Sequence, residues 1–223
     1  VSNFHYVFDG IAEIVLLLGN GHGQFDRVRR LPSSRGLNLV STGDLDGDGR
    51  HDLIAGFFGY NYSSDPGAIS PMLNRGSGVF AARIDSPLGE APYQGAIDDF
   101  NGDNIPDLAV ALTGLGETYG PGRLALLTGH AGGSFQISSY LPVGANPFGV
   151  ASGDFNADGK RDLAATNALS ASVSVLLGAG DGTFAGGREY AVGDLPSFVA
   201  VADLNRDGMQ DLAITNSIPG YPG

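Results

Sequence analysis

The stretch 154–163, which reads DFNADGKRDL, decides the fold because the chain carries four copies of its pattern. The other copies begin at Asp44, Asp99 and Asp203, so that successive copies start 55, 55 and 49 positions apart. Each copy ends in Asp-Leu, and a Phe lies 19 residues before the first Asp of each. These residues are Phe25, Phe80, Phe135 and Phe184. A period of about 50 residues is typical of repeat architectures and indicates one structural unit per copy.

Short apolar runs separated by turn residues surround each acidic stretch. In the third copy, 148–151 precedes the stretch, 163–166 follows it, and 173–177 leads into the glycine-rich turn 178–182. A fourth run begins at Thr183. Runs of this length between turn signals are typical of β-strands. Glycine supplies the positive φ that tight hairpins need, and the chain has 36 Gly among 223 residues, more than twice the usual share of about 7%.

Four strands in about 50 residues predict an all-β protein, a β-propeller built from four-stranded antiparallel blades. We expect one propeller domain over residues 1–223, with four blades in this chain. Its expected parts are a half-blade at 11–36, blades at 37–90, 91–145 and 146–194, and a half-blade at 195–217. Either the N- and C-terminal half-blades pair and close the ring, which removes exposed strand edges, or the chain is a slice of a larger propeller.

Charge and composition exclude several classes of function. The chain has 24 acidic and 12 basic residues and a net charge of -12, which disfavours binding to nucleic acid or anionic lipid because both require a basic face. The longest apolar run, Ile14 to Leu18, is too short to insert across a bilayer. Cysteine is absent, which excludes a disulfide scaffold, zinc-thiolate sites and thiol catalysis.

Each acidic stretch has the pattern Asp-x-Asp/Asn-x-Asp-Gly/Asn-x-x-Asp. Side-chain oxygens at positions 1, 3, 5 and 9, with the backbone carbonyl at position 7, make a set of hard ligands suited to Ca²⁺. We therefore predict four Ca²⁺ sites. Their predicted ligands are Asp44, Asp46, Asp48, Arg50 and Asp52; Asp99, Asn101, Asp103, Ile105 and Asp107; Asp154, Asn156, Asp158, Lys160 and Asp162; and Asp203, Asn205, Asp207, Met209 and Asp211.

The acidic stretches also resemble the start of an EF-hand, and they have the composition of metal-free turns. An EF-hand requires Glu at position 12, where this chain has Ala55, Val110, Ala165 and Ile214, so that interpretation fails. Solvated turns without metal remain an alternative, because Asp, Asn and Gly favour turns in any case. Of the 24 acidic residues, 13 lie in the four stretches despite their mutual repulsion, and calcium binding explains this clustering better. Four Ca²⁺ would change the net charge from -12 to about -4.

The repeats resemble FG-GAP/VCBS repeats of the integrin α-subunit type. Phe148-Gly149 matches the Phe-Gly element, 154–162 the calcium loop, and Asp162-Leu163 the start of the next strand. The resemblance implies calcium bound between the first two strands of each blade, and an extracellular or cell-surface role in recognition or adhesion. Only the third copy has the Phe-Gly pair, and propellers of this family commonly have seven blades.

A partner surface is expected on the face opposite the calcium loops, where the loops between the second and third strands vary. Tyr60, Tyr62, Tyr119 and Tyr221 lie in or near these variable segments, and tyrosine offers both an apolar ring and a hydroxyl to a protein or glycan partner. The competing interpretation is that these tyrosines pack on neighbouring turns. A further alternative is a self-assembling structural module, joined through its half-blades.

We expect no enzymatic activity from this chain. His5, His22, His51 and His130 stand alone, and no nucleophile elbow, P-loop or zinc motif is present in the sequence. The remaining alternative is a propeller that forms part of a carbohydrate-active enzyme.

Overall fold

The computed structural model describes residues 12–33, 36–58, 67–81, 85–113 and 122–217, and all of its regular structure is β. Within these ranges there is no helix long and apolar enough to cross a membrane.

Three four-stranded antiparallel sheets make up most of the described chain, which confirms the predicted all-β fold of four-stranded sheets. Blade 1 contains β3 (Gly36–Gly43), β4 (Asp52–Phe58), β5 (Ala68–Met72) and β6 (Ser86–Pro87). Blade 2 contains β7 (Ala91–Asp98), β8 (Asp107–Thr113), β9 (Gly122–His130) and β10 (Ser134–Val143). Blade 3 contains β11 (Pro147–Gly153), β12 (Asp162–Asn167), β13 (Ser172–Leu176) and β14 (Arg188–Ala191).

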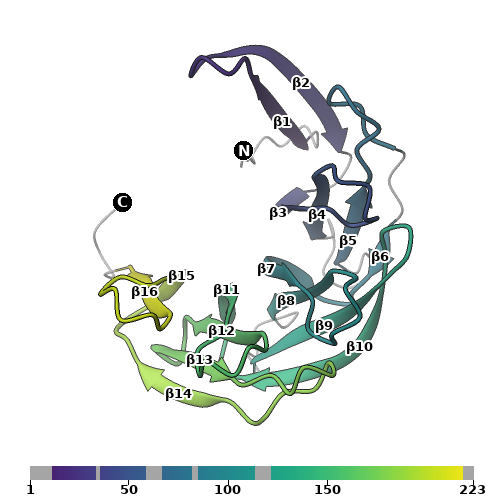
Figure 1. Cartoon of the computed structure of the whole chain (residues 1–223). Coiled ribbons are helices and arrows are strands. Elements are labelled where there is room, and N and C mark those ends of the chain that lie inside the picture. The colour runs from purple at the N-terminus through teal and green to yellow at the C-terminus, as the bar shows by residue number, and fades with distance from the viewer. Residues whose placement is uncertain (1–11, 34–35, 59–66, 82–84, 114–121, 218–223) are drawn as a thin grey trace.

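Two further sheets have only two strands each. The N-terminal half-blade pairs β1 (Ala12–Gly19) with β2 (Phe25–Ser33), and the C-terminal half-blade pairs β15 (Pro196–Ala202) with β16 (Asp211–Asn216). The five sheets follow one another around an arc, with the two half-blades at its ends (Figure 1). The first strands of adjacent sheets, β3, β7, β11 and β15, contact one another along the inside of this propeller-like arc.

Within the described residues the two half-blades form separate two-stranded sheets, and each packs on the complete blade beside it. Ile14 of β1 joins a buried cluster with Leu37 and Phe57 of blade 1. Val199 of β15 joins another with Ala164 and Val173 of blade 3. Figure 1 shows the resulting arc open between β1–β2 and β15–β16. Closure of the ring by the half-blades, one of the two predicted arrangements, is therefore not seen among the described residues, and the other, a slice of a larger propeller, stays a prediction.

The largest apolar clusters lie between complete blades. One joins Leu45 and Ile54 of blade 1 to Leu108 and Phe135 of blade 2, and a second joins blade 2 to blade 3 around Phe100. These contacts fix the acidic loops, since Leu45 and Phe100 are themselves position 2 of their loops. Both side chains are at most 2% exposed.

Candidate metal sites

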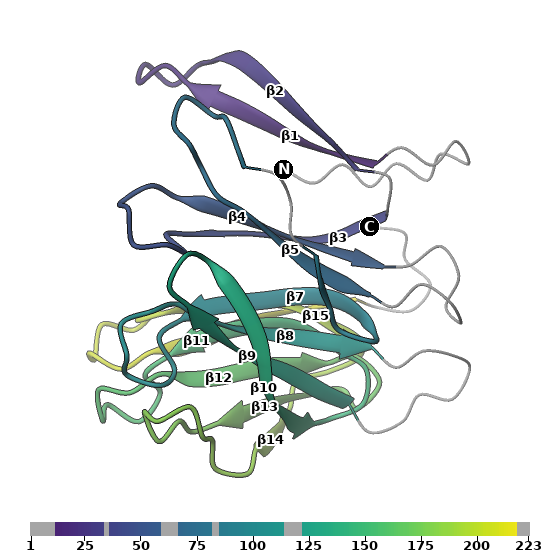
Figure 2. The same ribbon diagram turned by 90° about the vertical axis from the view of Figure 1, so that its right-hand side faces the viewer.

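The four acidic loops connect the first and second strands of four sheets: β3 to β4, β7 to β8, β11 to β12 and β15 to β16. In the view of Figure 2, these turns lie at the same side of the molecule as the turn between β1 and β2. The repeated turns therefore share one face, as the alternation of antiparallel strands requires.

The first loop brings three carboxylates together. Ligand oxygens of Asp44, Asp46 and Asp48 lie within 4.8 Å of one another, and the first two residues are half-buried. Two arginines partly balance this charge: Arg50 forms an ion pair with Asp48, and Arg75 Nη1 lies 3.9 Å from Asp46 Oδ2. In the other three loops the middle residue is Asn101, Asn156 or Asn205, so two carboxylates and one amide occupy the corresponding positions.

The Asp at position 1 organises the backbone of each loop. Asp44 Oδ1 accepts the N–H groups of Gly47 and Asp48 at 2.9 and 3.1 Å, and Asp44 Oδ2 accepts that of Gly49 at 2.9 Å. The N–H of position 6 donates to the same oxygen in the other loops, at 2.8, 2.9 and 3.0 Å. Four loops with different sequences thus adopt one backbone arrangement.

Left-handed backbone at positions 4 and 6 makes these bonds possible. Position 6 has positive φ in every loop, including φ 64 at Asn104, the one loop without Gly there. Position 4 also has positive φ, and in two loops it carries a residue other than Gly: Ala157 at φ 58 and Arg206 at φ 66. Short polar Asn tolerates this region, whereas Ala and Arg are strained in it.

Positions 3, 5 and 7 form a second repeated set of hydrogen bonds. The side-chain oxygen of position 3 accepts the N–H of position 5, as between Asn156 and Asp158 at 3.0 Å. Oδ1 of position 5 accepts the N–H of position 7 in all four loops, at Arg50, Ile105, Lys160 and Met209, over 2.8–2.9 Å. The side-chain oxygens of positions 1, 3 and 5 are therefore gathered in each loop by its own backbone.

The Asp at position 9 is placed differently, because both of its carboxylate oxygens accept backbone N–H groups in the three complete blades. Oδ2 accepts the N–H of position 2, as from Leu45 to Asp52 at 2.8 Å. Oδ1 accepts an N–H from the end of the third strand, as from Gly129 to Asp107 at 2.9 Å and from Gly178 to Asp162 at 2.8 Å. These Asp residues are at most 2% exposed. The Asp at position 9 thus joins its loop to the end of the third strand of its blade, whether or not it also binds a metal ion.

Two carboxyl groups of the loops have perturbed pKa values. The pKa of Asp46 is raised above its usual value by desolvation and then by the negative charges of Asp48 and Asp52, and the backbone hydrogen bond from Asp48 opposes this shift to a smaller extent. Burial raises the pKa of Asp107, and its hydrogen bonds from Gly129 and Phe100 oppose that shift. In both cases the carboxyl group lies where water is partly excluded, which disfavours its negatively charged form.

The donor set fits a hard divalent cation. All predicted side-chain ligands at positions 1, 3 and 5 present oxygen, the loop backbone already holds them in one place, and a cation would offset the repulsion in the first loop. Ca²⁺ would be held by these side chains, with position 9 as an added carboxylate where its hydrogen bonds leave lone pairs available.

Sequence reasoning missed the residues that meet position 9 from the third strand. They are Asn74, Gly129 and Gly178, which donate to Asp52, Asp107 and Asp162. Each lies six positions before a repeat Phe, and that shared offset was the available signal. Asn74 also donates through Nδ2 to the carbonyl of His51 at 3.0 Å.

The four tyrosines predicted to bind a partner, Tyr60, Tyr62, Tyr119 and Tyr221, lie outside the described residues. At the start of β9 in blade 2, the guanidinium of Arg123 lies 4.2 Å from the ring centroid of Tyr140 and forms an ion pair with Glu90. Tyr140 is 43% exposed, so this end of the blade presents an aromatic ring and charged groups to solvent.

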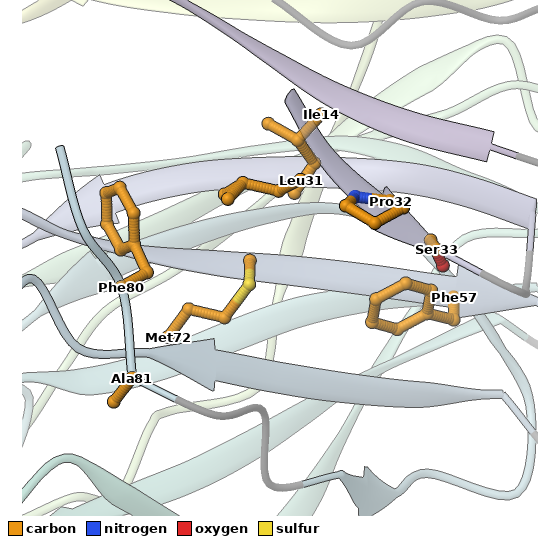
Figure 3. A pocket seen from close by; sticks show the side chains of 8 residues that line it. All are labelled: Ile14, Leu31, Pro32, Ser33, Phe57, Met72, Phe80 and Ala81. Atoms are coloured by element: carbon orange, nitrogen blue, oxygen red, sulfur yellow. The ribbon is translucent and has the colours of Figure 1, made fainter. Parts of the chain in front are cut away.

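A pocket of about 260 Å³ lies between the N-terminal half-blade and blade 1 (Figure 3). Ile14, Leu31, Pro32 and Ser33 line it from one side. Phe57, Met72, Phe80 and Ala81 line it from the other. None of these eight side chains is ionisable.

Comparison with known families gives one match. The pattern of the FG-GAP-like repeat matches residues 99–165 and 154–214. Each matched segment begins at the first Asp of one acidic loop and ends within the strand that follows the next loop, β12 or β16. No curated protein matches the chain.

Proposed function

The chain belongs to the FG-GAP-like repeat family, whose pattern covers just over half of its residues, and from this premise we propose that it is an extracellular recognition module stabilised by calcium. The observation that carries the proposal is the convergence of Asp44, Asp46 and Asp48 in a loop whose backbone arrangement recurs three more times. Carboxylates this close repel one another, and a cation bound among them makes the arrangement favourable.

Calcium would join the first two strands of each sheet at their shared turn. A ligand that binds only the folded state stabilises it by RT ln(1 + [L]/Kd), about 1.4 kcal/mol per site at ten times Kd. Extracellular calcium modules have Kd values of about 0.1–1 mM, so such sites are filled outside cells and largely empty in the cytosol. This difference in occupancy supports an extracellular or cell-surface location.

We propose that the sheets are blades of a propeller ring that extends beyond the arc of Figure 1. The side-by-side first strands and the inter-blade clusters support this arrangement. The ring would present the calcium loops on one face and leave the opposite face for a protein or glycan partner. The exposed Tyr140 ring under Arg123 is of the type that stacks on sugars or protein side chains.

Calorimetric titration of the metal-free protein with Ca²⁺ tests the metal sites. We expect binding heat and a higher melting temperature in calcium than in chelator. The variant Asp48→Asn removes one carboxylate from the first loop and lowers the number of bound ions, while Asp194→Asn, outside the loops, is the matched control. Absence of binding heat together with an unchanged melting temperature would refute calcium stabilisation.

Binding to a printed array of glycans, read in calcium, tests the partner surface. The triple variant Tyr60→Ala, Tyr62→Ala and Tyr119→Ala is expected to lose binding that the wild type shows. Tyr190→Ala, an exposed tyrosine on the outer strand of blade 3, serves as the control and keeps it. Equal binding by the triple variant would contradict recognition through this face.

A further inference from the structure

Seven Asn-Gly or Asp-Gly pairs lie in the described ranges, and in six of them the Gly N–H is held by a hydrogen bond. At positions 4 and 6 of the acidic loops the acceptor is the position-1 Asp, over 2.7–3.0 Å. In the outer turn of blade 3, Gly182 donates to the carbonyl oxygen of Phe100 at 2.9 Å. The exception is Asn20-Gly21, between β1 and β2, where the N–H of Gly21 donates to no described residue.

A free N–H matters in such a pair because the backbone can react with the preceding side chain, and Gly has no side chain that would hinder the approach. The Gly nitrogen loses its proton to water and bonds to Cγ of the Asn, whose amide nitrogen takes up a proton and leaves as ammonia. Water then opens the resulting cyclic imide at either carbonyl and leaves Asp or isoaspartate. An N–H bonded to a carboxylate resists both the loss of its proton and the movement toward Cγ.

The equivalent turn of blade 1 shows which acceptor the β1–β2 turn lacks. In blade 1, the N–H of Gly76 donates to Asn74 Oδ1 at 2.9 Å. Gly21 and Gly76 both lie four positions before the repeat Phe of their hairpin, and Gly19 holds the place of Asn74. Because Gly19 has no side chain, it offers Gly21 no oxygen.

The surroundings of Asn20 favour the reaction further. Its Oδ1 accepts the N–H of His22 at 2.9 Å, which draws electron density from the Cγ that is attacked. A Cβ placed on Gly21 would meet no atom within 4 Å, so the nitrogen has room to move. Gly180, the equivalent residue of blade 3, also donates its N–H to no described residue, so a neighbouring blade does not supply the acceptor there.

We propose that Asn20 is a site of spontaneous deamidation and that Asn101-Gly102, the same dipeptide in the second acidic loop, is protected by Asp99. Both Asn residues are half-buried and both Gly residues are exposed, so access of solvent does not distinguish the pairs. The hydrogen bond does, because Gly102 donates to Asp99 Oδ1 at 2.7 Å. A Cβ on Gly102 would also lie 3.1 Å from the carbonyl oxygen of Gly180, which restricts movement of this segment.

Deamidation at position 20 changes the end of the β1–β2 hairpin. It adds one negative charge, and isoaspartate also adds one carbon atom to the backbone next to Gly21. The bond from the N–H of Asn20 to the carbonyl of Gln24, 3.0 Å long, closes this turn and lies beside the inserted atom. The acidic loops keep their backbone, because the position-1 Asp that organises each loop also holds the reactive N–H groups. This inference does not depend on bound calcium.

Peptide mapping by mass spectrometry, after incubation of the folded protein at mildly alkaline pH, measures both reactions in one sample. Deamidation replaces NH2 by OH, and fragmentation of the peptides assigns the mass change to position 20 or 101. Since the bond from Gly102 to a carboxylate must break first, we expect Asn20 to react at least about tenfold faster than Asn101. Samples in calcium and in chelator are both read, so the comparison stands whether or not calcium stabilises the fold.

Unfolding in guanidinium chloride is the control for the dipeptide itself. The two pairs have the same residues, so their rates should become similar once the hydrogen bonds of the loop are lost. Equal rates at Asn20 and Asn101 in the folded protein, or a difference of the same size in the unfolded chain, would overturn the proposal.

Two substitutions at Gly19 test the missing acceptor. Gly19→Asn supplies the oxygen that Asn74 supplies in blade 1 and should slow deamidation at position 20 about fivefold. Gly19→Ala adds a Cβ without an acceptor and should keep the wild-type rate, since a Cβ there meets no atom closer than 3.8 Å. The same rate in both variants would contradict the role assigned to the free N–H of Gly21.

Discussion

The backbone N–H of Gly182 donates to the carbonyl oxygen of Phe100 at 2.9 Å, which joins the outer turn of blade 3 to the acidic loop of blade 2. The N–H of Phe100 donates in turn to Asp107 Oδ2 at 3.1 Å. One peptide segment of the loop is thus bonded to its own blade and to the next. Adjacent blades are therefore connected through the loops proposed to bind calcium.

Truncation of Phe100 should destabilise the protein strongly. The ring is 1% exposed and meets Phe184 edge to face, so Phe100→Ala is expected to cost about 3–5 kcal/mol of unfolding free energy. Phe100→Leu should cost less than about 1.5 kcal/mol, because Leu45 fills the equivalent position in blade 1. Urea denaturation measures both.

The control for that comparison is Leu169→Ala, at a residue that is 49% exposed. It is expected to change the unfolding free energy by no more than about 0.5 kcal/mol. If Phe100→Ala behaved like Leu169→Ala, the contact between blades 2 and 3 would not contribute to stability.

Positions 5 and 9 of the second loop should respond differently to substitution in chelator. Asp107→Ala leaves the buried N–H groups of Phe100 and Gly129 without acceptors and should cost about 2–4 kcal/mol even without metal. Asp103→Ala removes an exposed carboxylate that accepts the N–H of Ile105 and should cost less than about 1 kcal/mol in chelator. Chemical denaturation with and without Ca²⁺ separates the two effects. Equal losses in chelator would contradict a structural role specific to position 9.

The sequence predicted the strands well because their signals are local. Apolar runs such as 163–166 and the turn 178–182 required only neighbouring residues to interpret, and the structure places β12 at Asp162–Asn167. The two-stranded ends were also readable from the phase of the repeat. Ring closure was not, because it depends on where the two ends of the arc lie after every sheet has packed on its neighbour, as Ile14 does on Phe57.

In the candidate metal sites, too, the local contacts were predictable from the sequence and the contacts between strands were not. Asp154, Asn156 and Asp158 gather because each bonds to a backbone N–H within five residues, a distance over which spacing predicts geometry. Asp162 meets Gly178 across 16 residues and two strands. Its second role depends on strand pairing, which the spacing of the acidic stretch alone does not contain.

Addition of one methyl group at Gly178 should disrupt blade 3. A Cβ there would lie 2.1 Å from the backbone carbonyl oxygen of Arg161, so the hairpin must shift and weaken the bond from Gly178 to Asp162. We expect Gly178→Ala to cost about 1–3 kcal/mol, measured by thermal or urea unfolding in chelator. Gly186→Ala, with open space around its Cβ, is the matched control, and an equal effect at both positions would show that the crowding is relieved at no cost.

Removal of a methyl group at position 4 of the third loop should have the opposite effect. Ala157 has φ 58, a left-handed conformation that costs an L-residue about 1–2 kcal/mol, while Gly47 and Gly102 occupy the same position without that strain. Ala157→Gly relieves this strain, but it also gives the unfolded chain more conformational freedom, which opposes the gain. We therefore expect the free energy of unfolding to rise by about 0.5–1 kcal/mol. Ala202→Gly in β15, where no positive φ is required, should lower stability by a similar amount. Because both variants remove the same methyl group from the same chain, opposite signs in urea denaturation would assign the difference to backbone conformation, and the same sign would contradict strain at position 4.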